Sequence, residues 1–126
     1  MLLELLSDLL DIDDVLFVVR SGGATSEIKN DRLKIRRKER WITLGQNDDP
    51  AHMHVDSEAV FSAEFIQEER PGRTSYSVRF FDENKGRILA AFFTKMYDES
   101  GMLIPEKKAA YDGLAEKYQQ RVEFKK

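Results

Sequence analysis

Apolar and polar residues follow two different periods along this chain, a helical period at both ends and a strand period between them. Near the N-terminus, apolar residues recur every three or four positions: Leu2, Leu5, Leu6, Leu9 and Ile12. This stripe predicts an amphipathic helix that ends near Asp13. Near the other end, Pro105 suits a first helical turn. A second stripe predicts a helix there, through Ala110, Leu114, Ala115, Tyr118 and Val122.

The middle of the chain consists of short runs whose side chains alternate in character. They predict strands over residues 15–20, 24–29, 32–44, 51–56, 60–68, 74–81 and 87–97. The 32–44 run is long for one strand, and we expect it to bend near Glu39 and Arg40. The last run is apolar on both faces, which predicts a central strand.

Short polar turns, such as Ser21-Gly22-Gly23, separate these runs. Strands that follow one another through short turns form an antiparallel meander. The predicted fold is therefore α+β, with a large antiparallel β-sheet flanked by N- and C-terminal helices. With 126 residues, the chain has the length of one domain, residues 1–126.

Composition narrows the possible partners. A formal net charge of −3 gives no overall attraction to nucleic acid or to anionic lipid. No apolar run approaches the roughly 18 residues of a membrane span, and the leucine-rich start lacks the basic residues of a secretory leader. The absence of cysteine excludes disulfide bonds and thiolate chemistry. We expect a cytoplasmic protein that binds neither nucleic acid nor membrane.

The chain has two histidines, His52 and His54, in the predicted strand at 51–56. Side chains two residues apart on a strand point to the same face, so the two imidazoles should lie together. Imidazole is the commonest metal ligand in proteins and an axial ligand of haem iron. The pair is therefore the first candidate for chemistry, although two surface histidines without a function are equally compatible with the pattern.

A second candidate is a row of cations in the 32–44 run. Every even-numbered residue there is basic: Arg32, Lys34, Arg36, Lys38 and Arg40. On one strand these side chains share a face, which suits carboxylates, phosphates or porphyrin propionates. A solvated face that prevents edge-to-edge association is the alternative. No aromatic residue alternates with the cations, which disfavours nucleic-acid binding.

Gly45, His52, His54 and Glu58 approximate the first metal-binding motif of cupins. The spacing differs by one residue before His52, and no downstream histidine supplies the second motif. A site with two histidines and a carboxylate would hold a divalent metal with open positions for substrate. The cupin resemblance therefore predicts a metal-dependent enzyme as a third possibility.

Several motifs follow one another in a defined order: Ser21-Gly22-Gly23 with Ser26-Glu27-Ile28-Lys29, Trp41-Ile42-Thr43-Leu44-Gly45, His52-Met53-His54, Ser77-Val78-Arg79-Phe80-Phe81-Asp82 and Ala91-Phe92-Phe93. In this order they resemble the haem-utilisation family typified by HemS, ChuX and HutX. The chain has the length of a single-domain member, half of the duplicated HemS type. The resemblance implies a large antiparallel sheet, a homodimer, and the handling of haem and its iron in the cytoplasm.

The resemblance also implies site residues. His54 falls on a histidine that the family often has, so it is the first candidate for a haem contact and iron ligand, with His52 as the alternative. The family commonly shows a glycine and an arginine after the Phe92-Phe93 motif, where this chain has Thr94-Lys95-Met96-Tyr97. Candidates for the propionates are Lys95, Arg79 and Arg36, and Tyr97 is a further candidate to approach iron.

The sequence thus predicts a haem-binding or haem-trafficking protein without a catalytic cycle of its own. The second hypothesis is a dimeric interaction or regulatory module that has the same fold and binds no haem. The third is the cupin-like enzyme that uses His52 and His54.

Overall fold

The computed structural model describes residues 1–124. The helices are α1 (Leu2–Leu10) and α2 (Pro105–Tyr118). The strands are β1 (Val15–Ser21), β2 (Ala24–Lys29), β3 (Ile35–Lys38), β4 (Trp41–Leu44), β5 (Met53–Asp56), β6 (Ser62–Arg70), β7 (Arg73–Phe81), β8 (Arg87–Phe93) and β9 (Arg121–Glu123). The predicted α+β class, an antiparallel sheet with a helix near each end, is confirmed.

A six-stranded antiparallel sheet forms the centre of the molecule, in the order β2-β1-β8-β7-β6-β9. Strand β8 lies between β1 and β7, as its two apolar faces predict. It ends at Phe93 rather than at residue 97. Lys95 has a positive φ of 54°, which interrupts the extended backbone.

Residues 32–44 form a hairpin instead of one bent strand. Strands β3 and β4 pair in antiparallel register through a turn at Glu39 and Arg40. Glu39 has a φ of 57°, the left-handed conformation that a two-residue hairpin turn requires. Strand β5 then pairs with β4, so that β3-β4-β5 is a separate three-stranded sheet. The expected single meander is therefore divided between two sheets.

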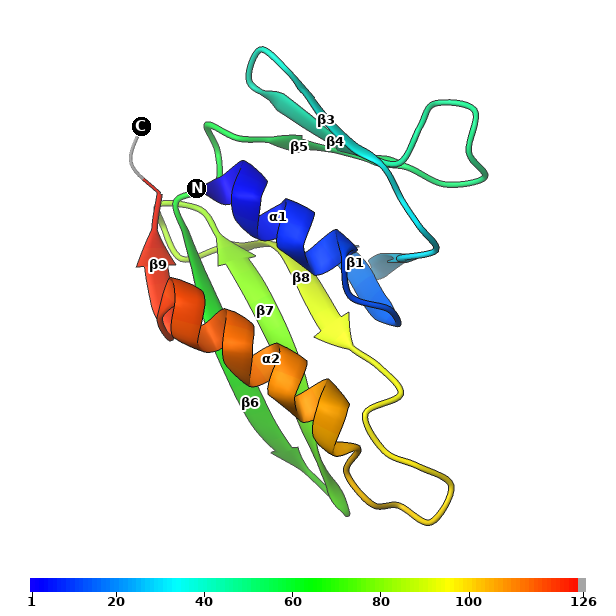
Figure 1. Cartoon of the computed structure of the whole chain (residues 1–126). Coiled ribbons are helices and arrows are strands. Elements are labelled where there is room, and N and C mark those ends of the chain that lie inside the picture. The colour runs from blue at the N-terminus through cyan, green and yellow to red at the C-terminus, as the bar shows by residue number, and fades with distance from the viewer. Residues whose placement is uncertain (125–126) are drawn as a thin grey trace.

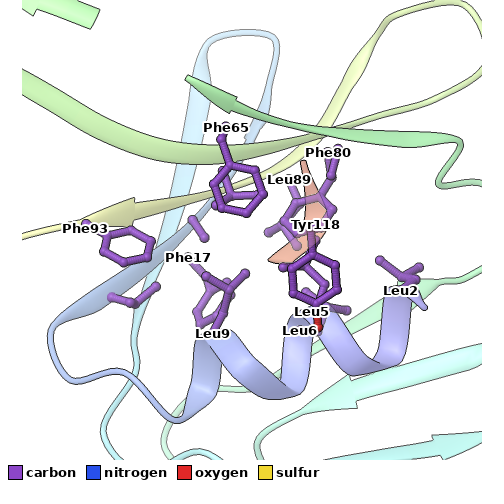
Figure 2. Packing of buried hydrophobic residues seen from close by; sticks show 14 of the residues in the cluster. Leu2, Leu5, Leu6, Leu9, Phe17, Phe65, Phe80, Leu89, Phe93 and Tyr118 are labelled. Atoms are coloured by element: carbon purple, nitrogen blue, oxygen red, sulfur yellow. The ribbon is translucent and has the colours of Figure 1, made fainter. Parts of the chain in front are cut away.

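Both helices cover the same face of the six-stranded sheet, and α1 lies next to the three-stranded sheet as well (Figure 1). The apolar stripe of α1 is buried, as predicted: Leu2, Leu5, Leu6 and Leu9. Figure 2 shows these leucines packed with side chains from the large sheet, including Phe17, Phe80 and Leu89. Ile42, Leu44 and Val55 of the small sheet belong to the same core. Helix α1 therefore joins the two sheets.

Helix α2 buries Tyr111, Ala115 and Tyr118 against the sheet. The helical stripe was expected to continue to Val122, but Val122 lies in β9 and pairs with Ala63 of β6. Gln119, with a φ of 69°, ends the helix and allows the chain to return as a strand. The C-terminal helix is thus followed by an edge strand.

Polar contacts hold the two helices together. Lys117 Nζ and the Tyr118 hydroxyl donate to Asp8 Oδ2 at 2.8 and 2.5 Å. Burial disfavours the ionised Asp8, but these two hydrogen bonds outweigh it and lower the pKa of the Asp8 carboxyl. At the end of α1, Asn30 Nδ2 donates to the carbonyl oxygens of Leu10 and Ile12 at 2.9 and 2.8 Å.

Within residues 1–124, neither helix is long and apolar enough to cross a membrane.

Candidate functional site

The outer surface of the three-stranded sheet carries the histidines, and we call it the imidazole face. Directly paired residues in an antiparallel sheet point to the same side. The register pairs Arg36 with Thr43, Thr43 with His54, Lys38 with Trp41, and Trp41 with Asp56. The opposite side carries the buried Ile42, Leu44 and Val55. The imidazole face consists of Arg36, Lys38, Trp41, Thr43, His52, His54 and Asp56.

The two imidazoles lie together, as their spacing predicts. Their ring centroids are 5.1 Å apart, edge to face. The His54 Nδ1 atom shares a hydrogen bond with the Thr43 hydroxyl at 2.8 Å, and Thr43 is itself buried. A hydrogen bond at one ring nitrogen orients the ring and leaves the other nitrogen for a ligand. Thr43 therefore fixes the orientation of the His54 ring through Nδ1, and Nε2 is the ring nitrogen outside this contact.

Trp41 and two cations share this face with the histidines. Trp41 is 45% exposed, which is unusual for the largest apolar side chain. Arg36 is exposed and its guanidinium donates to Asn47 Oδ1 at 3.4 Å. His54 and Trp41 also line a hollow of about 260 Å³, together with Val19 and Ile88. The face thus combines imidazole, an exposed indole and positive charge.

The cationic row is shorter than expected. Only Arg36 and Lys38 of its five members lie in β3. Arg32 has a φ of 56° and lies outside the strand, because the chain turns there before β3 begins. Arg40 lies in the hairpin turn and donates to both carboxylate oxygens of Asp56, at 2.8 and 2.6 Å. The prediction of one continuous five-residue row was wrong.

The three-ligand metal site of the cupin hypothesis does not form. Among residues 1–124, no group of three histidine, cysteine, aspartate or glutamate side chains is arranged to hold a metal ion. Glu58, the expected third ligand, lies 3.8 Å from the Arg40 guanidinium in an ion pair. The two-sheet architecture with helices on one face also differs from a cupin barrel.

The remaining predicted site residues lie elsewhere, at the helix-free face of the six-stranded sheet. A cleft of about 490 Å³ opens there, and we call it the arginine cleft. Lys95 and Tyr97 line it, and Arg79 lies beside it over the ring of Phe92. No histidine lines this cleft. The structure therefore brings His52, His54 and Arg36 together on one sheet and places Arg79, Lys95 and Tyr97 on the other.

Lys95 and Tyr97 already have partners within the chain. Lys95 Nζ lies 3.5 Å from Asp14 Oδ1. The Tyr97 hydroxyl donates to the Thr74 carbonyl oxygen at 2.8 Å and accepts from the Thr74 N–H at 2.9 Å. An iron atom on the Tyr97 oxygen would have to displace these hydrogen bonds. The segment after Phe93 thus stabilises the end of the six-stranded sheet at which β8 finishes.

Sequence reasoning missed Arg20 and Arg87, which line the arginine cleft. Alternation along β1 indicates that Arg20 shares a face with Leu16 and Val18. What brings Arg87 near that face is the register between β1 and β8, strands that are distant in the sequence. A lone arginine at the end of each strand carries no signal of that pairing.

Comparison with known proteins identifies structures that share this fold. A family model matches residues 3–119. The solved structure of “the Heme Binding Protein ChuX” superposes with a TM-score of 0.75 at 17% identity, over 90% of this chain and 70% of ChuX. The chain therefore has the fold of the ChuX-type haem-utilisation proteins. No curated protein matches the sequence significantly.

Other structures of this fold include proteins of which this chain covers a larger or a smaller share. A protein from Erwinia carotovora superposes with a TM-score of 0.76 at 18% identity, over 92% of this chain and 70% of that protein. The haem-binding protein PhuS from Pseudomonas aeruginosa gives a TM-score of 0.69 at 13% identity. The superposition covers 94% of this chain and 33% of PhuS. Identities this low establish the shared fold, and the ChuX-like fold that the motifs predict is confirmed.

Proposed function

We propose that this chain is a haem-utilisation protein of the ChuX and HutX type that binds haem on the imidazole face, with His54 Nε2 as the iron ligand. The observation that carries the proposal is the His54 imidazole, which the Thr43 hydroxyl orients at 2.8 Å beside an exposed tryptophan. Structural neighbours whose names state haem binding support it. Haem supplies the iron and two propionates, and the residues of this face supply a partner for each.

The residues of the imidazole face fit the chemical parts of haem. Neutral imidazole is a common axial ligand of haem iron. The exposed indole of Trp41 offers a flat apolar surface for the macrocycle. The Arg36 guanidinium and the Lys38 ammonium suit the carboxylates of the propionates. His52, 5.1 Å from His54 between ring centroids, is the alternative ligand.

We also infer that the protein carries haem rather than transforming it, acts as a homodimer, and works in the cytoplasm. The family resemblance supports these inferences. The hollow of about 260 Å³ beside His54 is below the usual size of a ligand pocket, about 300–1,000 Å³. A haem bound to this face of a single chain would therefore keep much of its surface uncovered, which suits transfer to a partner.

The second candidate function is a protein interaction module without haem. The observation that favours it is the segment after Phe93, in which Lys95 and Tyr97 serve internal contacts instead of a ligand.

Haemin titration distinguishes the two functions. The wild type should give a saturable shift of the Soret band, and His54→Ala should weaken apparent affinity more than about tenfold, since the iron loses a coordinate bond. Thr43→Val, which removes only the hydroxyl that orients His54, should weaken it less. His52→Ala is the matched control, because it removes the neighbouring imidazole and leaves the Thr43 contact in place.

The titration also has an outcome that contradicts the proposal. If His52→Ala loses affinity while His54→Ala does not, His52 is the ligand and the assignment to His54 is wrong. If the wild type and both variants respond to haemin without saturation and to the same extent, the interaction module is favoured over haem binding.

A further inference from the structure

The arginine cleft is an apolar hollow with a positively charged rim. Its floor includes Leu16 and Val18 of β1 and Phe92 of β8. These side chains point away from the helices, because their neighbours Phe17 and Ala91 point into the core. The volume of about 490 Å³ is in the usual range for small-molecule sites. Val18 is buried, whereas Leu16 and Phe92 are half-buried and leave apolar surface open to the cleft.

Guanidinium groups gather around the ring of Phe92. The Cζ atoms of Arg79 and Arg87 lie 5.7 and 6.0 Å from the ring centroid, within the range of cation–π contacts. Arg79 is 3.4 Å from Glu68 Oε1, which balances its charge in part. Burial lowers the pKa of Arg87, and the positive charges of Arg79 and Arg20 lower it further. Arg79 and Arg87 therefore lie close together at this ring, and Arg20 lines the same cleft.

Carboxylates among residues 1–124 balance the positive charge of the rim only in part. Arg20, Arg70, Arg73, Arg87 and Lys95 line the cleft with a single carboxylate, Glu27. Arg70 is paired with Glu68 at 2.6 Å, and Lys95 with Asp14 at 3.5 Å. No ion pair to Arg20, Arg73 or Arg87 forms within the described part of the chain. A bound anion would relieve the repulsion between these groups.

We propose that the arginine cleft binds a small organic anion with a flat apolar body, whose acidic group contacts Arg20 and Arg87 while the body packs on Phe92. The ligand class is that of aromatic carboxylates, sulfonates and phosphate esters. Guanidinium binds each of these acidic groups through paired N–H donors. This site is separate from the imidazole face and does not depend on haem binding there.

The probe for this site is 8-anilinonaphthalene-1-sulfonate, an aromatic sulfonate that fluoresces in apolar surroundings. The wild type should bind it saturably at one site per chain. Arg20→Met and Arg87→Met keep an extended apolar side chain and remove the charge, so each should weaken binding by about tenfold. Arg121→Met is the matched control, because Arg121 lies on β9 and pairs with Glu123 at 2.6 Å outside the cleft.

Three further measurements keep the test decisive. Glu27→Gln removes the carboxylate of the cleft and should tighten binding of the sulfonate, a gain that unfolding would not produce at one saturable site. N-phenyl-1-naphthylamine, the uncharged counterpart, should bind about tenfold more weakly than the sulfonate. His54→Ala should leave sulfonate binding unchanged, which separates this proposal from the haem proposal.

Specific results overturn the anion site. The wild type and the Arg20→Met/Arg87→Met double variant would then bind the sulfonate with equal affinity. Cooperative thermal unfolding of both proteins would verify that the double variant is folded. Equal affinity for the charged and the uncharged probe would show an apolar hollow without anion recognition. A loss in His54→Ala as large as that in Arg87→Met would place the probe on the imidazole face.

Discussion

Tyr111→Ala should lower the free energy of unfolding by about 3–5 kcal/mol, the usual cost of truncating a buried aromatic side chain. Tyr111 is 1% exposed and contacts three aromatic rings edge to face. The centroids of Phe65, Tyr76 and Phe93 lie 5.6, 5.2 and 5.0 Å from its own. Its removal would leave a cavity between α2 and the sheet. Urea denaturation followed by circular dichroism measures the change.

Tyr111→Phe separates the hydroxyl from the ring. The hydroxyl donates to the carbonyl oxygen of the fully buried Ser77 at 2.9 Å. Burial raises the pKa of Tyr111, so the group remains a protonated donor at neutral pH. Its loss should cost about 0.5–1.5 kcal/mol, the usual net contribution of one intramolecular hydrogen bond. A Tyr111→Ala variant no less stable than Tyr111→Phe would contradict the importance of the ring contacts.

Leu6→Ala should lower the free energy of unfolding by about 2–5 kcal/mol. Leu6 is fully buried in α1, the helix that packs with both sheets through the shared core. The matched control is Leu3→Ala on the same helix, because Leu3 is only partly buried and should lose less. Chemical denaturation of both variants measures the difference. Equal losses would show that α1 contributes by helix formation and not by joining the sheets.

The helices and the central strand could be predicted because they depend on periods within one segment. The leucine stripe of α1 requires a helix to bury one face, and the doubly apolar β8 requires neighbours on both sides. The hairpin at residues 35–44 could not be predicted in the same way. Its turn has Glu39 in the left-handed conformation, where asparagine or glycine is the usual signal. The alternating pattern alone does not reveal the reversal.

The same distinction, between patterns within one segment and pairing between segments, applies to the candidate sites. The histidine pair could be predicted, because two residues separated by one position on a strand necessarily share a face. Thr43 as the partner of His54 depends on the pairing of β4 with β5, and the arginine cleft depends on the pairing of β1 with β8. Strand register is set by the whole core, so these neighbours emerge only from the folded chain.

The assignment of haem to the imidazole face is tested most directly by residue-resolved NMR with gallium protoporphyrin, a diamagnetic substitute for haem. Amide signals of residues 41–44 and 52–56 should show the largest changes, and these should saturate at one porphyrin per chain. His54→Ala should abolish them and leave the spectrum of the free fold intact. Changes confined to the arginine cleft, around residues 87–97, would contradict the account, as would a spectrum that the porphyrin does not alter.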